Sequence, residues 1–256
     1  MSRRRLEPWL IVPDTHAPYH NEAAWRLMMS VGRATKPYGV AHLGDFGDFY
    51  QVSSHSKDPG RRETFKDECE VTKGLRNDLD ELKPRKKKYV KGNHCHRLER
   101  YIEDKASALY GMVSVDSALG LSDNGWAITD YRDYTNIGKL SLTHDTGQGG
   151  KYTAALAAET FQASVAIGHH HALQYFVTGD AKGHRKLGVS FGWLGDADKA
   201  DYMHRIKARK LWSLGFGLAY HDTQSDLVHV VPVPILEEDG KYVCVVEGAR
   251  YATRRG

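Results

Sequence analysis

The chain has 256 residues, of which 41% are hydrophobic, three cysteines and a formal net charge of +4 at pH 7. This length accommodates one large α/β domain with a complete core, so we expect a single domain over residues 1–256. No apolar run approaches the ~20 residues of a membrane span, and the three separated cysteines argue against a disulfide framework. These features predict a cytoplasmic protein with no membrane association. The modest positive charge permits a polyanionic partner without requiring one.

Strand-like apolar runs alternate with helix-like segments, which is typical of an α/β layer fold. We expect Asn21 to cap the first helix and Pro84 to end the second. In chain order the predicted elements are a strand at 9–12, a helix at 22–33, a strand at 39–43, a helix at 63–82, a strand at 88–91, a helix at 97–109, a lid or connector at 111–134, a strand at 139–143, a helix at 152–162 and a strand at 164–167. The remainder, 172–256, is expected to be β-rich. It contains one predicted hairpin from 174–178 to 186–192 and another from 227–236 to 241–246.

Seven side chains of metal-binding type occur in short motifs, and each motif follows an apolar run. The motifs read Asp14-Thr15-His16, Gly44-Asp45-Phe46-Gly47-Asp48, Gly92-Asn93-His94, His144-Asp145 and Gly168-His169-His170-His171. Because open α/β sheets bind ligands at the carboxyl ends of their strands, we expect the motifs to meet there. Two divalent metals roughly 3.5–4 Å apart, sharing one carboxylate, need about this many ligands and support in-line displacement at phosphorus.

The first and last motifs each carry two candidate ligands two residues apart. In extended backbone, residues i and i+2 point the same way. We therefore expect Asp14 and His16 to reach one metal together. We also expect the rings of His169 and His171 to share one face, with His170 pointing elsewhere. Neutral imidazole suits Zn, Fe or Mn.

The three middle motifs supply the other candidates. Asp45 is placed to bridge two metals because a carboxylate has two oxygens, whereas Asp48 is more suited to a supporting position than to ligation. Asn93 offers a neutral carbonyl oxygen as a ligand. His94 is placed to contact substrate and to protonate the leaving oxygen. His144, directly after a strand, is a further ligand candidate.

Each motif alone has an ordinary explanation: a chance triplet, a helix-capping turn, a polar turn, a lone histidine or a His-rich turn. The joint occurrence of five motifs, in this order and each after an apolar run, favours a shared site.

Taken together, the motifs resemble those of the calcineurin-like metallophosphoesterase family: DxH, GDxxD, GNH followed by an acid, a lone His, and GHxH. The resemblance spans roughly residues 9–172, and the layout is similar to phage- and prophage-encoded, nuclease-like members. It implies a four-layer α-β-β-α sandwich of two mixed β-sheets flanked by helices. It also implies one metal held by Asp14, His16 and His171, a second held by Asn93, His144 and His169, a bridge at Asp45 and an acid or transition-state stabiliser at His94.

Two positions depart from the family pattern. Cys95 stands where an acid is usual, which affects how His94 is oriented. Asp145 replaces the common glycine after His144, which bears on the local backbone geometry.

The resemblance implies attack on phosphorus by a metal-activated hydroxide, with His94 and the neighbouring Asp48 as the expected catalytic residues. Two divalent ions are expected, with Mn first and Fe or Zn also suitable. Nucleic acid is the favoured phosphodiester substrate because basic clusters and aromatic residues could bind phosphates and stack on bases. These are Arg3–Arg5, Arg61–Arg62, Arg85–Lys88, His204–Lys210, Tyr202, Trp212 and Tyr220.

Two alternatives remain open. A phosphomonoesterase is a weaker match because the protein-phosphatase branch carries extra arginines beside its metal motifs, and Arg97 is the only close arginine here. A non-catalytic binding module is disfavoured by the complete set of ligand-type residues.

Overall fold

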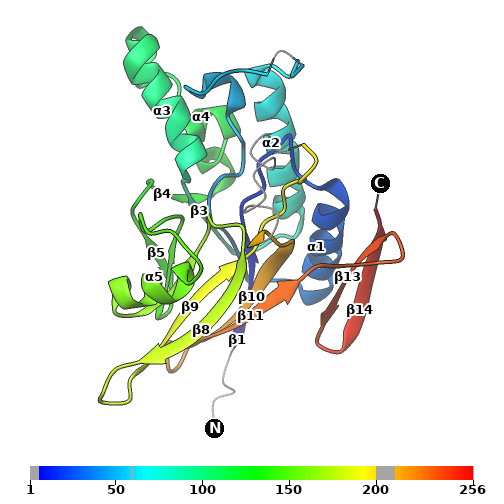
Figure 1. The fold of residues 1–256 in the computed structure, drawn as a ribbon, viewed down its shortest axis with the longest axis vertical. Helices are drawn as coiled ribbons and strands as arrows, with labels where there is room; N and C mark the ends of the chain where they lie inside the picture. Colours follow the sequence, from blue (N-terminus) through cyan, green and yellow to red (C-terminus); the bar gives the residue numbers. More distant parts are fainter. Residues whose placement is uncertain (1–5, 59, 200–210, 256) are drawn as a thin grey trace.

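Two β-sheets form the centre of the protein in the computed structural model, which describes residues 6–58, 60–199 and 211–255 (Figure 1). The larger sheet has the order β11-β10-β1-β2-β3-β4. It consists of β1 (Leu6–Val12), β2 (Gly39–His42), β3 (Lys86–Val90), β4 (Ala127–Thr129), β10 (Gly215–Asp222) and β11 (Val228–Pro234). The second sheet has the order β5-β6-β7-β9-β8. It consists of β5 (Thr135–Ile137), β6 (Leu140–Thr143), β7 (Ser164–Ile167), β8 (Leu173–Gly179) and β9 (Arg185–Phe191).

Helices and a small third sheet surround these strands. The helices are α1 (Glu22–Thr35), α2 (Phe65–Glu81), α3 (Asn93–Lys105), α4 (Val115–Leu119) and α5 (Thr153–Phe161), with 3₁₀ turns η1 (Tyr50–Val52), η2 (Ser107–Leu109) and η3 (Ser122–Asn124). The third sheet contains β12 (Leu236–Glu238), β13 (Lys241–Val246) and β14 (Ala249–Arg254), and it packs beside α1. Figure 1 shows α1 and α2 on one side of the strands and α5 on the other.

The hydrophobic core is layered accordingly. Between the sheets, Trp9 and Ile11 of β1 pack with apolar residues that include Leu142 and Phe191 of the second sheet. The opposite face of β1 packs against α1 and α2, and α5 covers the outer face of β7. Strands buried on both faces read as near-continuous apolar runs, which explains the absence of alternation in β1. The predicted α-β-β-α arrangement of two mixed sheets is confirmed.

Local sequence signals account for the helix starts. The Asn21 side chain accepts a hydrogen bond from the backbone N–H of Ala24 at 2.9 Å and caps α1 as predicted. Thr64 and Asp67 form a capping box that begins α2. No helix in the described part of the chain is long and apolar enough to cross a membrane.

Three segments differ from their predicted structure. The expected lid or connector at 111–134 contains α4 and β4, and β4 pairs in parallel with β3. These two elements have five and three residues, too few to show a hydrophobic period.

Strand β10 was not predicted. It is buried between β1 and β11, and its glycines break the pattern of a strand. The predicted hairpin at 227–246 is divided, because β11 pairs with β10 whereas β12 pairs with β13. The hairpin of β8 and β9 is confirmed.

The sheet topology determines where the motifs lie. Strands β1, β2 and β3 run parallel as neighbours, and so do β6, β7 and β9. Their carboxyl ends therefore collect at one edge of each sheet, and the five motifs follow five of these ends.

Candidate metal centre

The structure brings the seven predicted ligand side chains together in two groups. In the first group, His171 Nε2 lies 3.0 Å from His16 Nε2 and 3.1 Å from Asp14 Oδ2. His16 Nε2 and Asp14 Oδ2 are 3.9 Å apart. All three side chains are buried, and these atoms are close enough to share one cation.

The second group contains the other four. Asn93 Oδ1 lies 3.0 Å from His144 Nε2 and 2.8 Å from His169 Nδ1. Asp45 Oδ2 lies 3.3 Å from His144 Nε2. The other oxygen of Asp45 accepts the backbone N–H of His94 at 2.9 Å, so Oδ2 is the atom turned toward the group. Two clusters of oxygen and nitrogen donors result, with the members that the family resemblance implies.

Hydrogen bonds behind the rings set the direction of their lone pairs. The Nδ1–H of His144 donates to the carbonyl of Leu43 at 2.8 Å, and that of His16 donates to Asp48 Oδ1 at 3.0 Å. When the ring is neutral and its proton is on Nδ1, the lone pair of Nε2 faces the donor group. Such outer hydrogen bonds fix the tautomer in protein metal sites.

The backbone at the site is in a sparsely populated conformation. His16, Asp45, His169 and His171 all have positive φ, between 48° and 68°. Non-glycine residues in this region cost free energy and tend to gather at functional sites.

This geometry corrects the argument from extended alternation. His169 faces Asn93 and His144, whereas His171 faces Asp14 and His16. The two rings therefore point into different donor groups and do not share one face. The ring of His170 is 5.0 Å from that of His169, centroid to centroid, and its Nε2 is buried without a hydrogen-bond partner among the described residues.

Glycines before the ligands permit close approach of the chain segments. A Cβ on Gly92 would lie 2.0 Å from Asp45 Oδ1 and 2.6 Å from Asp45 N. Gly44 has φ of +106°, and a Cβ there would lie 2.4 Å from His144 Nδ1. A side chain at either position would displace a candidate ligand. Steric crowding therefore explains why glycine precedes the ligand in the GD and GN motifs.

The site holds three buried carboxylates. Asp14, Asp45 and Asp48 are each at most 3% exposed. Burial opposes ionisation, yet the neighbouring histidines hold the pKa of all three carboxyls below its ordinary value. Burial likewise disfavours the charged form of His144, but Asp45 and Asp14 raise its pKa to about 9.

This charge balance provides a test of whether metal ions fit the residues present. Buried carboxylates need compensating positive charge. The carboxylate and amide oxygens and the imidazole nitrogens of this site match the ligand preferences of divalent Mn, Fe or Zn. The donor set and its charge therefore fit two divalent cations.

The predicted catalytic residue His94 lies beside both groups. Its Nδ1–H donates to the Asp48 carbonyl at 2.9 Å, and Nδ1 is 2.8 Å from Asp48 Oδ1. Arg97 Nη2 donates to His94 Nε2 at 2.9 Å, and Arg97 Nη1 donates to the Asp48 carbonyl at 3.0 Å. Since an arginine only donates, Nε2 accepts in this arrangement. Asp48 thus orients His16 and His94 together, and Arg97 is a site residue whose contact the sequence did not reveal.

The two departures from the family pattern have structural explanations. Cys95 is fully buried, with Sγ 2.8 Å from Tyr89 Oη, so it belongs to the core rather than to the surroundings of the His94 ring. Asp145 Oδ1 accepts the backbone N–H of Gly147 at 2.7 Å, and Oδ2 accepts the hydroxyl of Tyr131 at 3.1 Å. Asp145 therefore stabilises the turn that follows His144.

Two tryptophans flank the first group. Trp193 stacks on His171 with ring centroids 4.9 Å apart and an interplanar angle of 14°. Trp212 contacts the same ring edge-on at 4.3 Å. Trp193 comes two residues after β9, a strand parallel to β7, so its place at this edge follows from topology once β9 is known. The sequence pattern alone gave no such signal.

The basic clusters considered for nucleic acid lie in different places. Arg85–Lys88 lies at the start of β3, whereas Asn93 follows the end of that strand, so this cluster is at the opposite edge of the sheet from the site. Lys87 forms an ion pair with Asp80 at 2.7 Å, and Lys88 Nζ donates to Thr135 Oγ1. These lysines are engaged within the fold.

Arg61 lies over the rings of Tyr19 and Tyr50, with its guanidinium carbon 4.0 and 4.4 Å from their centroids. Tyr220 donates to Glu247 at 2.7 Å and is not part of the site. The clusters Arg3–Arg5 and His204–Lys210 and the aromatic Tyr202 lie outside the described residues.

Comparisons with known proteins give remote similarities. No family model matches the chain. The gene 54 protein of Mycobacterium phage L5 is 26% identical over 246 residues, which cover 88% of this chain and 92% of the phage protein. Vps29 from Chaetomium thermophilum aligns with a TM-score of 0.48 and 11% identity over 98% of this chain and 96% of that chain. YfcE, a phosphoesterase from E. coli, aligns with a TM-score of 0.42 and 13% identity over 88% of this chain and 98% of that chain. These similarities are too remote to assign an activity to the chain.

Proposed function

We propose that the protein is a dinuclear metal-dependent phosphoester hydrolase of the calcineurin-like metallophosphoesterase type, and that nucleic acid is its substrate. The observation that supports this most strongly is the pair of buried donor groups, one of Asp14, His16 and His171 and the other of Asn93, His144, His169 and Asp45. Each group would hold one divalent cation, with Asp45 Oδ2 between them. Bound divalent cations lower the pKa of water and polarise phosphoryl oxygens, which is the chemistry that ester hydrolysis needs.

The chain's own groups would orient the phosphate and handle the proton. In this structure the proton of His94 is on Nδ1 and points at Asp48, and Nε2 accepts a hydrogen bond from Arg97. Delivery of a proton from Nε2 to a leaving oxygen requires the guanidinium to leave this contact, because two donors cannot face each other. Arg97 would then have N–H groups available for a phosphoryl oxygen, where a fixed positive charge stabilises the transition state.

A phosphodiester in nucleic acid is proposed because of the groups around the donor clusters. The tryptophans beside His171 offer aromatic faces, on which bases stack. Arg97 and the basic residues beyond it on α3 offer positive charge for phosphates. The complete donor set argues against a non-catalytic binding module.

A phosphomonoesterase is the alternative, and one contact favours it. Arg97 lies directly beside His94, where a guanidinium could pair with the additional negative charge of a monoester. Arg97 is the one arginine that the sequence places close to the metal motifs, and this contact puts it at the site.

The test is hydrolysis by protein saturated with Mn²⁺, assayed on bis-p-nitrophenyl phosphate, p-nitrophenyl phosphate, and single- and double-stranded DNA. Turnover of the diester and of DNA, with little turnover of the monoester, is the expected result. Turnover of the monoester alone would replace the proposal by its alternative. Two bound metals without turnover of any substrate would refute an enzymatic function.

A further inference from the structure

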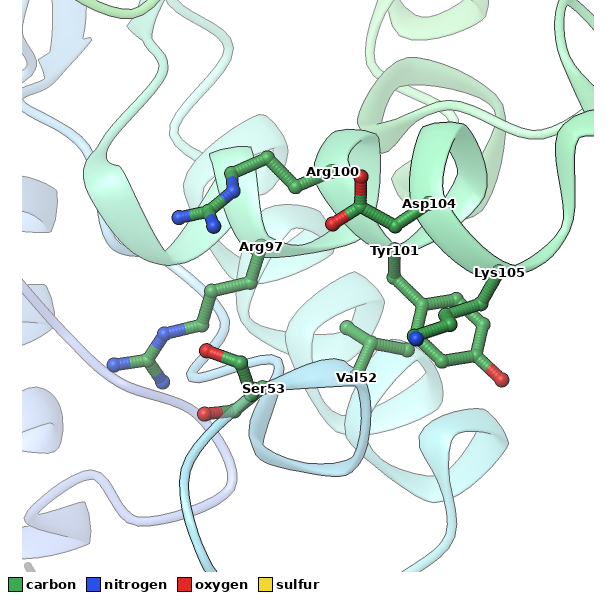
Figure 2. A pocket seen from close by; sticks show the side chains of 8 residues that line it. Val52, Ser53, Arg97, Arg100, Tyr101, Asp104 and Lys105 are labelled. Carbon is green, nitrogen blue, oxygen red and sulfur yellow. The ribbon is translucent and has the colours of Figure 1, made fainter.

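A cavity of about 170 Å³ lies against α3 (Figure 2). One of its lining residues, Arg97, contacts His94 of the candidate metal centre. Its lining includes Arg97, Arg100 and Lys105 of α3 and Ser53 and Ser54 of the facing loop. The volume is many times the ~10–15 Å³ that one water needs, so a phosphate group can enter. The proposed function uses the positive charge of α3 in general terms and assigns no particular ligand group to this cavity.

Its charge is predominantly positive. Three cations line it, against one carboxylate, Asp104. Lys57 is a further cation near the lining, because its ammonium donates to the Ser53 carbonyl at 2.7 Å. Burial, and to a smaller extent the nearby charge of Arg97, lower the pKa of Lys57.

The arginines differ in how they are held. Arg97 is fixed by its hydrogen bonds to His94 and to the Asp48 carbonyl, and its side chain is 18% exposed. Arg100 is exposed and forms no ion pair with a carboxylate in the described part of the chain. In Figure 2 both guanidinium groups extend toward the same side, whereas Tyr101 and Lys105 lie at the other end of the pocket. Arg100 thus has its donors available for an incoming anion.

Spacing along α3 links the cavity to the metal centre. Asn93, whose side chain belongs to the second donor group, is the first residue of α3. Arg97 and Arg100 follow one and two turns later, at a rise of about 6 and about 10 Å. A nucleic-acid strand carries a phosphate every ~3.4 Å of duplex axis. If one phosphate of a strand lay at the metal centre, the next few phosphates along the strand would therefore fall within the length of α3 between Asn93 and Arg100.

We infer that the Arg97–Arg100 face of α3, with Ser53 and Ser54, is a subsite for a backbone phosphate flanking the scissile phosphate of a polynucleotide. This inference rests on the proposed function and specifies its substrate as one with several phosphates. Arg100 is the residue that determines this preference, because Arg97 also contacts His94.

The test is binding of a fluorescein-labelled single-stranded phosphorothioate 12-mer to the Mn²⁺-loaded protein, followed by fluorescence anisotropy at several salt concentrations. The variants are Arg100→Ala and Arg100→Lys. The matched control is Arg33→Ala, which removes an exposed arginine from the last turn of α1, next to the start of β2 and thus at the opposite edge of the sheet.

Loss of one phosphate contact should reduce the slope of log Kd against log salt by about 0.7 in Arg100→Ala. The Kd at low salt should rise about threefold to tenfold, Arg100→Lys should recover most of the slope, and Arg33→Ala should match the wild type. An Arg100→Ala slope equal to that of Arg33→Ala, or no binding of the 12-mer by the wild type, overturns the subsite.

Hydrolysis separates this inference from the proposed function. Cleavage of bis-p-nitrophenyl phosphate, which has a single phosphate, tests the metal centre without the subsite. Normal diester cleavage with an unaltered Arg100→Ala slope refutes the subsite alone. Absence of diester and DNA cleavage, with an Arg100-dependent slope, refutes the hydrolase and leaves a phosphate-binding face.

Discussion

Replacing the buried Glu68 of α2 by glutamine should stabilise the protein at pH 8 much more than at pH 5. The Glu68 side chain is 1% exposed. Its Oε1 accepts the backbone N–H of Tyr50 at 2.9 Å, whereas Oε2 is buried without a hydrogen-bond partner among the described residues. Burial, with a smaller contribution from the charge of Asp48, raises the pKa of Glu68 from 4.5 to about 7.

The magnitude follows from this pKa. An unfolded chain loses the Glu68 proton near pH 4.5, whereas the folded protein keeps it until about pH 7. Between these values the folded state binds more protons, so its stability falls as pH rises. The difference between these two pKa values corresponds to about 3 kcal/mol in total, of which roughly 2–3 kcal/mol is lost between pH 5 and pH 8. Glutamine does not titrate, so the variant lacks this loss.

Urea unfolding of both proteins at pH 5 and pH 8 measures the effect. The gain in unfolding free energy of Glu68→Gln over wild type should be about 2–3 kcal/mol larger at pH 8 than at pH 5. Glu81→Gln, which removes an exposed carboxylate from the end of the same helix, is the control and should show no such difference. A Glu68→Gln gain that is equal at both pH values would refute the reasoning that burial holds this carboxyl neutral.

The remaining predictions concern the candidate metal centre. His94→Ala should lower kcat about 10²–10⁴-fold while the Mn content measured by mass spectrometry stays near wild type, and loss of metal would count against its catalytic role. Asp45→Ala should lose metal and activity together, because it removes the carboxylate between the donor groups; an active variant with two metals would exclude that role. Gly92→Ala should lower the unfolding free energy by about 1–3 kcal/mol and reduce metal content, because its Cβ meets Asp45 Oδ1; unchanged urea midpoint and metal content would contradict this.

The convergence of the candidate ligands could be predicted from the sequence for a topological reason. Ligand-type residues follow apolar runs, and parallel strands bring such positions to one edge whatever the details of the turns. Asp14, Asp45, Asn93, His144 and His169 were placed by this rule, and their side chains converge in the structure.

Other features depend on local geometry that a single sequence does not show. The left-handed backbone at His16 and His171, rather than strand alternation, directs their rings. The third helix was predicted to begin at residue 97 but begins at Asn93, and this earlier start places Arg97 one turn from Asn93 and beside His94. Elements as short as α4 and β4 carry too few residues for a periodic signal.

Anomalous diffraction from crystals of the protein soaked in Mn²⁺ would test most directly whether these side chains hold a pair of cations. Two peaks are predicted. One should lie about 2.0–2.3 Å from Asp14 Oδ2, His16 Nε2 and His171 Nε2, and the other equally near Asn93 Oδ1, His144 Nε2 and His169 Nδ1, with Asp45 Oδ2 in reach of both. Ordered side chains in these positions with no anomalous signal between them, at saturating Mn²⁺, Fe²⁺ or Zn²⁺, would contradict the account.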